Sequence, residues 1–213
     1  MKRAIARATV RTMFLMLLPI AAGVSCAPSS PEGSLALTSR TANPLRLDAT
    51  FTHGAYAVEP TGVSMILSTV SMQDLRNGDF EDAQLVDVQV MWEPRAGRTP
   101  VSKDSTNLVI RYIVLVGDQV GIYGGGGFGW PRGTPGETGF GLKITGSSLS
   151  LVDATDDFRD LLSPASLLGS IGGPLDAALM VKMRDAISQI VTDRLGRTRW
   201  VLDEAAGPLP DRS

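Results

Sequence analysis

The chain has 213 residues, enough to bury the core of one sizeable domain, and its 22 acidic residues outnumber its 20 basic ones. An acidic surface repels phosphate backbones, which argues against nucleic acid as a partner. The single His and single Cys exclude a metal site of two or three imidazoles and an intramolecular disulfide.

The N-terminus has the pattern of an export signal. Lys2, Arg3, Arg7 and Arg11 precede an apolar stretch with no acidic residue among them, as in the first two regions of a signal peptide. A membrane-spanning helix needs about 20 apolar residues, and the serines and prolines after position 24 make this stretch too polar. We therefore predict that residues 1–25 are a signal peptide that is cleaved.

Cys26 stands directly behind a run of small residues, Ala22, Gly23, Val24 and Ser25. This run resembles the lipobox of bacterial lipoproteins, except that Gly23 occupies the position where leucine is usual. The resemblance covers only the first 26 residues. It implies that Cys26 becomes an acylated, palmitate-type N-terminus. The alternative is an ordinary cleavage site, for example after Ala22, with an incidental thiol at Cys26.

The same resemblance predicts a place in the bacterial cell envelope. Ala27 stands where, in enteric bacteria, an aspartate retains lipoproteins in the inner membrane, and this favours the outer membrane. Residues 26–44 are rich in Ser, Pro, Thr and Ala, which predicts a flexible tether that reaches on the order of 50 Å when extended. Without its four signal-peptide cations the mature chain carries sixteen basic and 22 acidic residues, a formal net charge of −6.

Apolar and polar residues alternate over residues 45–52, which predicts a strand with one face in water. His53 follows in a predicted turn before Gly54. As the only histidine, it would have to serve any Ser/His/Asp triad, and Ser64 and Asp48 are the partners at hand. Nothing in the spacing selects them, so catalysis by His53 is not our prediction.

Residues 63–70 and 86–93 predict two further strands, the second by strict alternation. A short helix is predicted between them. Ser71 is its predicted N-cap, Asp74 is the capping-box partner three positions later, and Gly78 ends the helix.

Leu108–Val116 is almost continuously apolar and β-branched, which predicts a strand deeper in the sheet. Arg111 interrupts it. This side chain either pairs with a buried carboxylate such as Asp87 or Glu93, or lies at an edge or on the outer face of the sheet. The Gly-Asp dipeptide at 117–118 then predicts a type II′ hairpin into the next strand.

Nine glycines lie in residues 124–141, together with Phe128 and Trp130. The segment lacks the Gly-Lys-Ser/Thr ending of a phosphate-binding loop. It predicts a long, mobile hairpin loop that displays these two aromatic residues, in which case it can bind a small molecule, a glycan or a peptide. The alternative is that both aromatic residues fold back on the sheet.

A second hairpin is predicted where residues 146–148 separate residues 140–144 from residues 149–152. Four aspartates follow in one segment: Asp153, Asp156, Asp157 and Asp160. Their spacing differs from that of helix-loop-helix calcium sites. Thr155 as the N-cap of a short helix over residues 156–162 explains them instead, and we predict no metal and no cofactor.

The last third of the chain changes period. Ser163-Pro164 is a candidate start for a helix. Apolar residues then recur every three or four positions over residues 174–195, which predicts an amphipathic helix that ends before Gly196. Residues 200–202 are a candidate edge strand, and residues 203–213 a disordered tail.

Together these patterns predict a single α+β domain over residues 45–202, with an antiparallel sheet of about six strands and the long C-terminal helix packed on it. We predict a non-catalytic interaction or structural module at a membrane surface. Its partners are the membrane, through the lipid on Cys26, and an envelope protein or a glycan. Two alternatives stay open: a ligand binder that uses Phe128 and Trp130, and an enzyme of unrecognised type.

Overall fold

The computed structural model describes residues 31–95, 97 and 105–198. Within these ranges nine strands and two helices follow one another as β1 (Glu32–Ser39), β2 (Arg46–Phe51), β3 (His53–Glu59), β4 (Gly62–Ser68), α1 (Met72–Asn77), β5 (Asp82–Val90), β6 (Leu108–Val116), β7 (Gln119–Arg132), β8 (Gly139–Ala154), β9 (Ala165–Pro174) and α2 (Ala177–Leu195). The strands form one antiparallel sheet in the order β2-β1-β9-β8-β7-β6-β5-β4-β3. The predicted antiparallel sheet and C-terminal helix are confirmed, but the sheet of the described residues has nine strands instead of about six, and the domain is mainly β rather than α+β.

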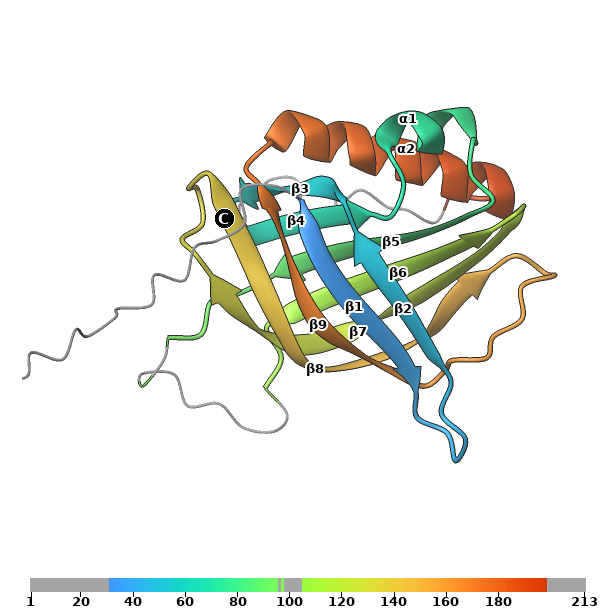
Figure 1. Ribbon diagram of the computed structural model, residues 1–213, viewed down its shortest axis with the longest axis horizontal. Helices are drawn as coiled ribbons and strands as arrows, with labels where there is room; N and C mark the ends of the chain where they lie inside the picture. Colours follow the sequence, from blue (N-terminus) through green and yellow to red (C-terminus); the bar gives the residue numbers. More distant parts are fainter. Residues whose placement is uncertain (1–30, 96, 98–104, 199–213) are drawn as a thin grey trace, which may run out of the picture.

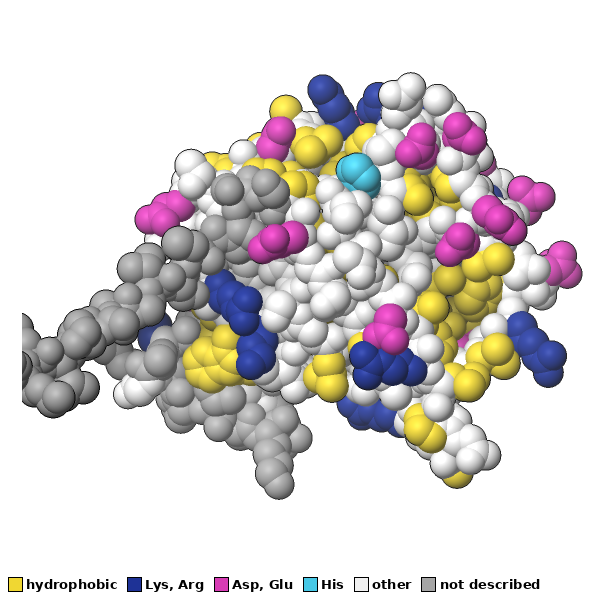
Figure 2. Space-filling view, viewed as in Figure 1, with side chains coloured by type: hydrophobic (Ala, Val, Ile, Leu, Met, Phe, Trp, Pro, Cys, Tyr) yellow, Lys and Arg dark blue, Asp and Glu magenta, His cyan; other side chains and the backbone are white. Residues whose placement is uncertain are grey.

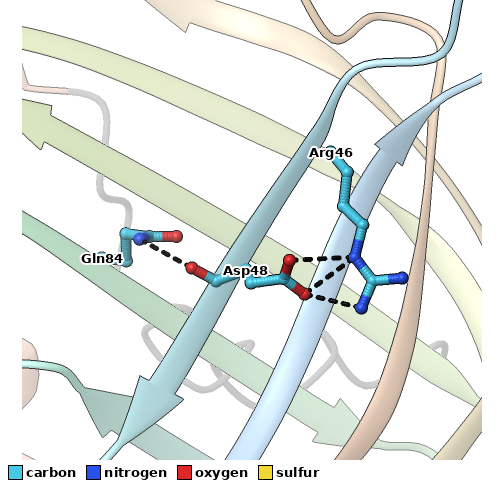
Figure 3. Close-up of polar contacts among 3 residues, drawn as sticks. All are labelled: Arg46, Asp48 and Gln84. Carbon is cyan, nitrogen blue, oxygen red and sulfur yellow. Dashed lines mark hydrogen bonds and ion pairs between the residues drawn. The ribbon is translucent and has the colours of Figure 1, made fainter.

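The sheet curls into a half-barrel, in which β1, β2 and β9 cross in front of β5–β7 (Figure 1). The end of β9 reaches β3, where Tyr56 and Leu175 form a parallel bridge. At β2, the Asp48 carbonyl accepts a hydrogen bond of 3.4 Å from Gln84 Nε2 of β5 (Figure 3). Both end strands of the sheet are thus held by contacts that cross the curl.

Alternate strand residues point inside the curl and form what we call the inner cluster. Its largest fully buried side chains include Phe51, Tyr56, Tyr112, Tyr123 and Phe140. The hydroxyl groups of the three tyrosines have hydrogen-bond partners, as buried polar groups require. The Tyr112 hydroxyl donates to Gln84 Oε1 at 2.6 Å, for example.

Helix α2 covers the opposite, outer face of the sheet along β3 and β4 (Figure 1). Its buried residues Met180, Met183, Ile187 and Val191 recur at helical spacing and meet outward-pointing residues of the strands. We call this second core the outer cluster. Asp176 caps the helix by accepting from Leu179 N at 2.8 Å, and Gly196 ends it at φ 65°. The predicted amphipathic helix is confirmed, but it begins after Pro174, which is the last residue of β9.

Three local predictions are confirmed. Ser71 caps α1, accepting from Asp74 N at 3.1 Å and donating to Asp74 Oδ2 at 2.6 Å, and Gly78 ends the helix at φ 67°. Leu108–Val116 is a strand with the predicted bounds. Gly117 takes a positive φ of 52° in the two-residue turn that joins β6 to β7.

The tether prediction is wrong for residues 32–39, which form β1 between β2 and β9. Leu35, Leu37 and Ser39 are buried at alternate positions. Only two large apolar side chains mark this alternation, so the Ser-rich and Thr-rich composition concealed it. Cys26, the predicted tail and the candidate strand at residues 200–202 lie outside the described residues.

The predicted hairpin at residues 146–148 is also wrong, because β8 runs through it as one strand. Its register with β9 shifts between Ile144 and Leu149. Ser147 fills the gap, since its Oγ donates to Leu167 O at 2.8 Å and accepts from Leu167 N at 2.6 Å. The Ser147 side chain therefore takes the place of the β8 backbone as hydrogen-bond partner of Leu167 at this register shift.

Residues 156–162 form no helix, and Ala165, directly after Ser163-Pro164, begins β9 instead of a helix. Asp160 Oδ1 organises the segment by accepting from Leu162 N at 3.0 Å and Ser163 N at 3.1 Å. Phe158 packs onto β7 at Gly121, where an added Cβ would meet its ring at 2.1 Å. Tertiary packing and an aspartate turn thus replace the predicted capped helix.

Candidate functional site

The predicted glycine-rich loop is a pair of strands. Residues 124–132 belong to β7 and residues 139–141 to β8, so the connection between them is only residues 133–138. Phe128 and Trp130 are therefore fixed on a paired strand. The prediction of a long loop is wrong, and the alternative that the aromatic residues fold back on the sheet describes them better.

Phe128 and Trp130 meet a third aromatic residue, Trp92, which follows β5. The Phe128 ring lies between the two indoles, 6.1 Å from Trp92 and 5.3 Å from Trp130 between ring centroids. Phe128 is 8% exposed, Trp92 is 38% exposed, and Trp130 is intermediate. A buried ring thus supports two indoles that reach the surface.

Asn107 holds this aromatic group in place from inside the protein. Its fully buried amide donates to Gly129 O at 2.9 Å and accepts from Gly129 N at 2.8 Å, and it also donates to Trp92 O at 3.2 Å. Gly129 faces the inner cluster, where an added Cβ would lie 2.8 Å from Leu108 Cδ1. Phe128 and Trp130, on either side of it, consequently face outward.

Two cations border the aromatic group. Lys143 of β8 lies directly opposite Trp130, and Arg132 follows two positions after Trp130 on β7. Both are exposed, and within the described part of the chain neither forms an ion pair. We call Trp92, Phe128, Trp130, Arg132 and Lys143 the aromatic-basic patch.

The patch lies at one end of the molecule. At the left of the view, where Figure 1 places the end of β7 and the start of β8, Figure 2 shows apolar side chains next to basic ones. Two exposed carboxylates, Glu93 and Glu137, belong to the adjoining connections. The patch is therefore locally cationic with acids at its margin.

The structure does not assemble a triad around His53. His53 is the first residue of β3, opposite Ser68, and not a turn residue as predicted. Asp48 is bound by Arg46, with contacts of 2.7 to 2.9 Å (Figure 3), and this hydrogen bonding lowers the Asp48 pKa. Ser64 donates to Glu59 Oε2 at 2.8 Å. Each proposed partner is thus engaged with a different residue.

A set of charged residues lies on the outer face beside α2. Asp87 stands directly opposite Arg111 in the strand register, and since Ile110 and Tyr112 belong to the inner cluster, Arg111 has the outer-face position that was one of its two sequence interpretations. Arg184 of α2 binds Glu59 at 3.0 Å. Burial raises the Asp87 pKa to about 6, although Arg184 and Arg111 act in the opposite direction. We interpret this set as a structural seam between helix and sheet.

In the acidic segment, Asp153 and Asp160 have structural partners. Asp153 binds Arg197 at 2.6 Å, and Asp160 accepts from the Tyr123 hydroxyl at 3.0 Å. Among the described residues no three His, Cys, Asp or Glu side chains lie together as metal ligands would.

Sequence reasoning had singled out Phe128 and Trp130 but missed Trp92, Arg132, Lys143 and Asn107. The available signal was the alternation of Phe128, Trp130 and Arg132, which places all three on one face of a strand. The glycines around them suggested a loop instead.

No protein-family model, curated protein or solved structure matches this chain. No helix in the described ranges is long and apolar enough to cross a bilayer.

Proposed function

We propose that the protein is a lipid-anchored, non-catalytic module of the bacterial cell envelope, held at a membrane surface through Cys26. The observation that carries the proposal is the export pattern that ends at the only cysteine, six positions before β1 begins. Acylation of a processed N-terminal cysteine adds two or three chains, and more than one chain is needed for stable membrane attachment.

The arrangement of polar side chains supports a non-catalytic role. The groups considered for catalysis are used in structural pairs, Arg46 with Asp48 and Ser64 with Glu59. The ion pair of Arg184 with Glu59 joins helix α2 to the sheet. The aromatic-basic patch instead brings exposed indoles together with two cations that form no ion pair within the described residues, and we assign to it the contact with a partner.

Intact mass of the membrane fraction tests the anchor. We expect the mass of a chain that begins at Cys26 and carries two or three acyl groups, whereas Cys26→Ala should remain uncleaved or leave the membrane. A free Cys26 thiol, or an unmodified N-terminus at Ala27, would contradict the proposal. Ser25→Thr, which keeps the cysteine, is the control for expression.

The partly exposed indoles of Trp92 and Trp130 favour one second candidate, binding of a glycan or peptide on the outer face of β7 and β8. Titration with soluble peptidoglycan fragments tests it, because a bound sugar ring changes indole fluorescence. Saturable binding that Trp130→Ala abolishes would place this function first.

A further inference from the structure

We infer that the aromatic-basic patch docks onto the anionic phospholipid surface that carries the anchor, so that the domain lies on the bilayer in one orientation. This inference rests on the lipid anchor proposed above. It concerns Trp92, Phe128, Trp130, Arg132 and Lys143, and it adds a second membrane contact made by the folded domain.

The chemistry of the patch suits the interface between water and lipid. Indole side chains are enriched at the interface between water and hydrocarbon, because they carry a large apolar body and one polar group. Basic residues are attracted to anionic headgroups within about one Debye length of the surface. Trp130 and Lys143 lie opposite each other on neighbouring strands, so both kinds of group meet the same plane.

The charge of the patch is complementary to that of an anionic bilayer. The mature chain has a formal net charge of −6, so most of its surface is repelled by anionic lipid. Arg132 and Lys143 are exposed without an ion-pair partner among the described residues. Other cations, such as Arg46, Arg184 and Arg197, are neutralised by carboxylates. The patch is therefore a face that an anionic surface can attract.

The stretch of sequence between Cys26 and β1 is short. Five residues separate Cys26 from Glu32, and six Cα steps span at most about 22 Å. Glu32 aligns across the sheet with Gly172, Gly172 with Gly141, and Gly141 with Arg132. Three strand spacings amount to about 14 Å. Glu32 and Arg132 also line one shallow depression, so the anchor attaches at the patch's end of the molecule.

The far end of the sheet is a poor alternative. Gln119, where β7 begins, lies on the order of 40 Å along the strand from Arg132. A lipid on Cys26 cannot easily bring that end to the bilayer. The short connection therefore selects the patch, which is presented by paired strands and needs no ordering before it binds.

The test uses the acylated mature protein in a Trp200→Phe background, reconstituted in phosphatidylcholine vesicles with a minor fraction of phosphatidylglycerol. Quenching of Trp92 and Trp130 fluorescence by lipids brominated near the headgroup reports docking. We expect strong quenching that weakens in phosphatidylcholine alone and at high salt. Arg132→Glu with Lys143→Glu should shift the docking equilibrium by well over about thirtyfold towards the undocked state, because the loss of each basic residue accounts for about fivefold and reversal adds repulsion.

The matched control is Arg76→Glu with Arg159→Glu, two exposed cations remote from the patch in α1 and in the connection after β8. It changes the net charge equally and should keep the quenching. Arg132→Gln with Lys143→Gln should give an intermediate effect. Acylated protein that floats with the vesicles but shows unquenched indoles, or equal loss in both charge-reversed pairs, would overturn the inference while the anchor stands. Protein without acyl groups that stays soluble would overturn both.

Discussion

Two buried polar side chains, Asn107 and Ser147, act as substitutes for backbone at irregular points of the sheet. Ser147 bridges the register shift of β8, and Asn107 pairs with both backbone groups of Gly129 next to the shift of β7. Each satisfies groups that the ladder leaves unpaired. The bends of the half-barrel therefore depend on single residues.

Replacing Asn107 by Ala should lower the free energy of unfolding by about 3 kcal/mol, because the Gly129 N–H, the Gly129 carbonyl and the Trp92 carbonyl lose their shared partner. Chemical denaturation measures this. Gln89→Ala removes a hydrogen bond to Thr61 at the surface and should cost far less. Equal costs for the two variants would show that water replaces the Asn107 amide.

Asp87 should make stability depend on pH. Its pKa is raised from 3.8 to about 6, first by burial and then by Glu59, against the pull of Arg184 and Arg111. A carboxyl whose folded pKa exceeds its unfolded pKa is harder to ionise in the folded state. Stability is therefore highest below about pH 4 for this group and falls as pH rises to about 6.

We expect wild-type unfolding free energy to lose up to about 3 kcal/mol through Asp87 between these limits. In Asp87→Asn this part of the pH dependence should disappear. The free energy of unfolding of the variant should therefore rise relative to that of the wild type from acid to neutral pH. Denaturant midpoints across the range measure the difference. Parallel profiles for the two proteins would mean that the guanidinium groups fully offset the effect of burial and leave the folded Asp87 pKa at its unfolded value.

At the scale of elements, the periodic segments were predictable and the glycine-rich ones were not. Leu108–Val116 and α2 could be predicted because the local sequence contains both their apolar pattern and the residues that begin and end them. The glycines of β7 carry no such pattern, because their role lies in a neighbouring strand: at Gly125 an added Cβ would lie 2.0 Å from Ser148 O of β8. A close approach between strands cannot be predicted until the strand pairing is known. The strand β1 was likewise missed, because its Ser-rich and Thr-rich sequence shows no clear pattern before its pairing with β2 and β9 is known.

The candidate site was also only partly predictable from the sequence. The sequence singled out Phe128 and Trp130 and left open whether they are displayed or folded back on the sheet, but their neighbours come from other strands. Trp92 follows β5 and Lys143 belongs to β8, so only the register of the sheet brings them together. Sequence alone therefore identified two of its members and not the patch.

Helix α2 should prove essential to the outer cluster. Ile187 is 1% exposed in that cluster, so Ile187→Asp should cost at least about 3 kcal/mol by burying an unpaired charge and losing apolar contacts. Val181 on the same helix is 57% exposed, and Val181→Asp should leave the denaturation midpoint nearly unchanged. Similar midpoints for both variants would contradict packing of α2 on the sheet.

For the whole molecule, the position of β1 changes the relation between domain and membrane. Sequence reasoning placed a tether of about 50 Å between lipid and fold, whereas β1 begins six positions after Cys26. With the proposed anchor on Cys26, a short connection would hold the patch near the bilayer at a high effective concentration, which falls roughly as the −3/2 power of linker length. Weak contacts of single indoles and cations would then suffice for the proposed docking.

Lengthening this connection tests that relation directly. Twenty Gly and Ser residues inserted after Ser29 make the linker about five times longer, so the docked population should decrease by about tenfold relative to the undocked one while acylation and flotation are unaffected. Bromolipid quenching of Trp92 and Trp130, at a salt concentration where docking is partial, measures the change. The same insert after Ser213 is the control for chain length and should have no effect. If the patch instead docks independently of the anchor's proximity, quenching will be equal with long and natural linkers, and orientation by the short N-terminal connection must be abandoned.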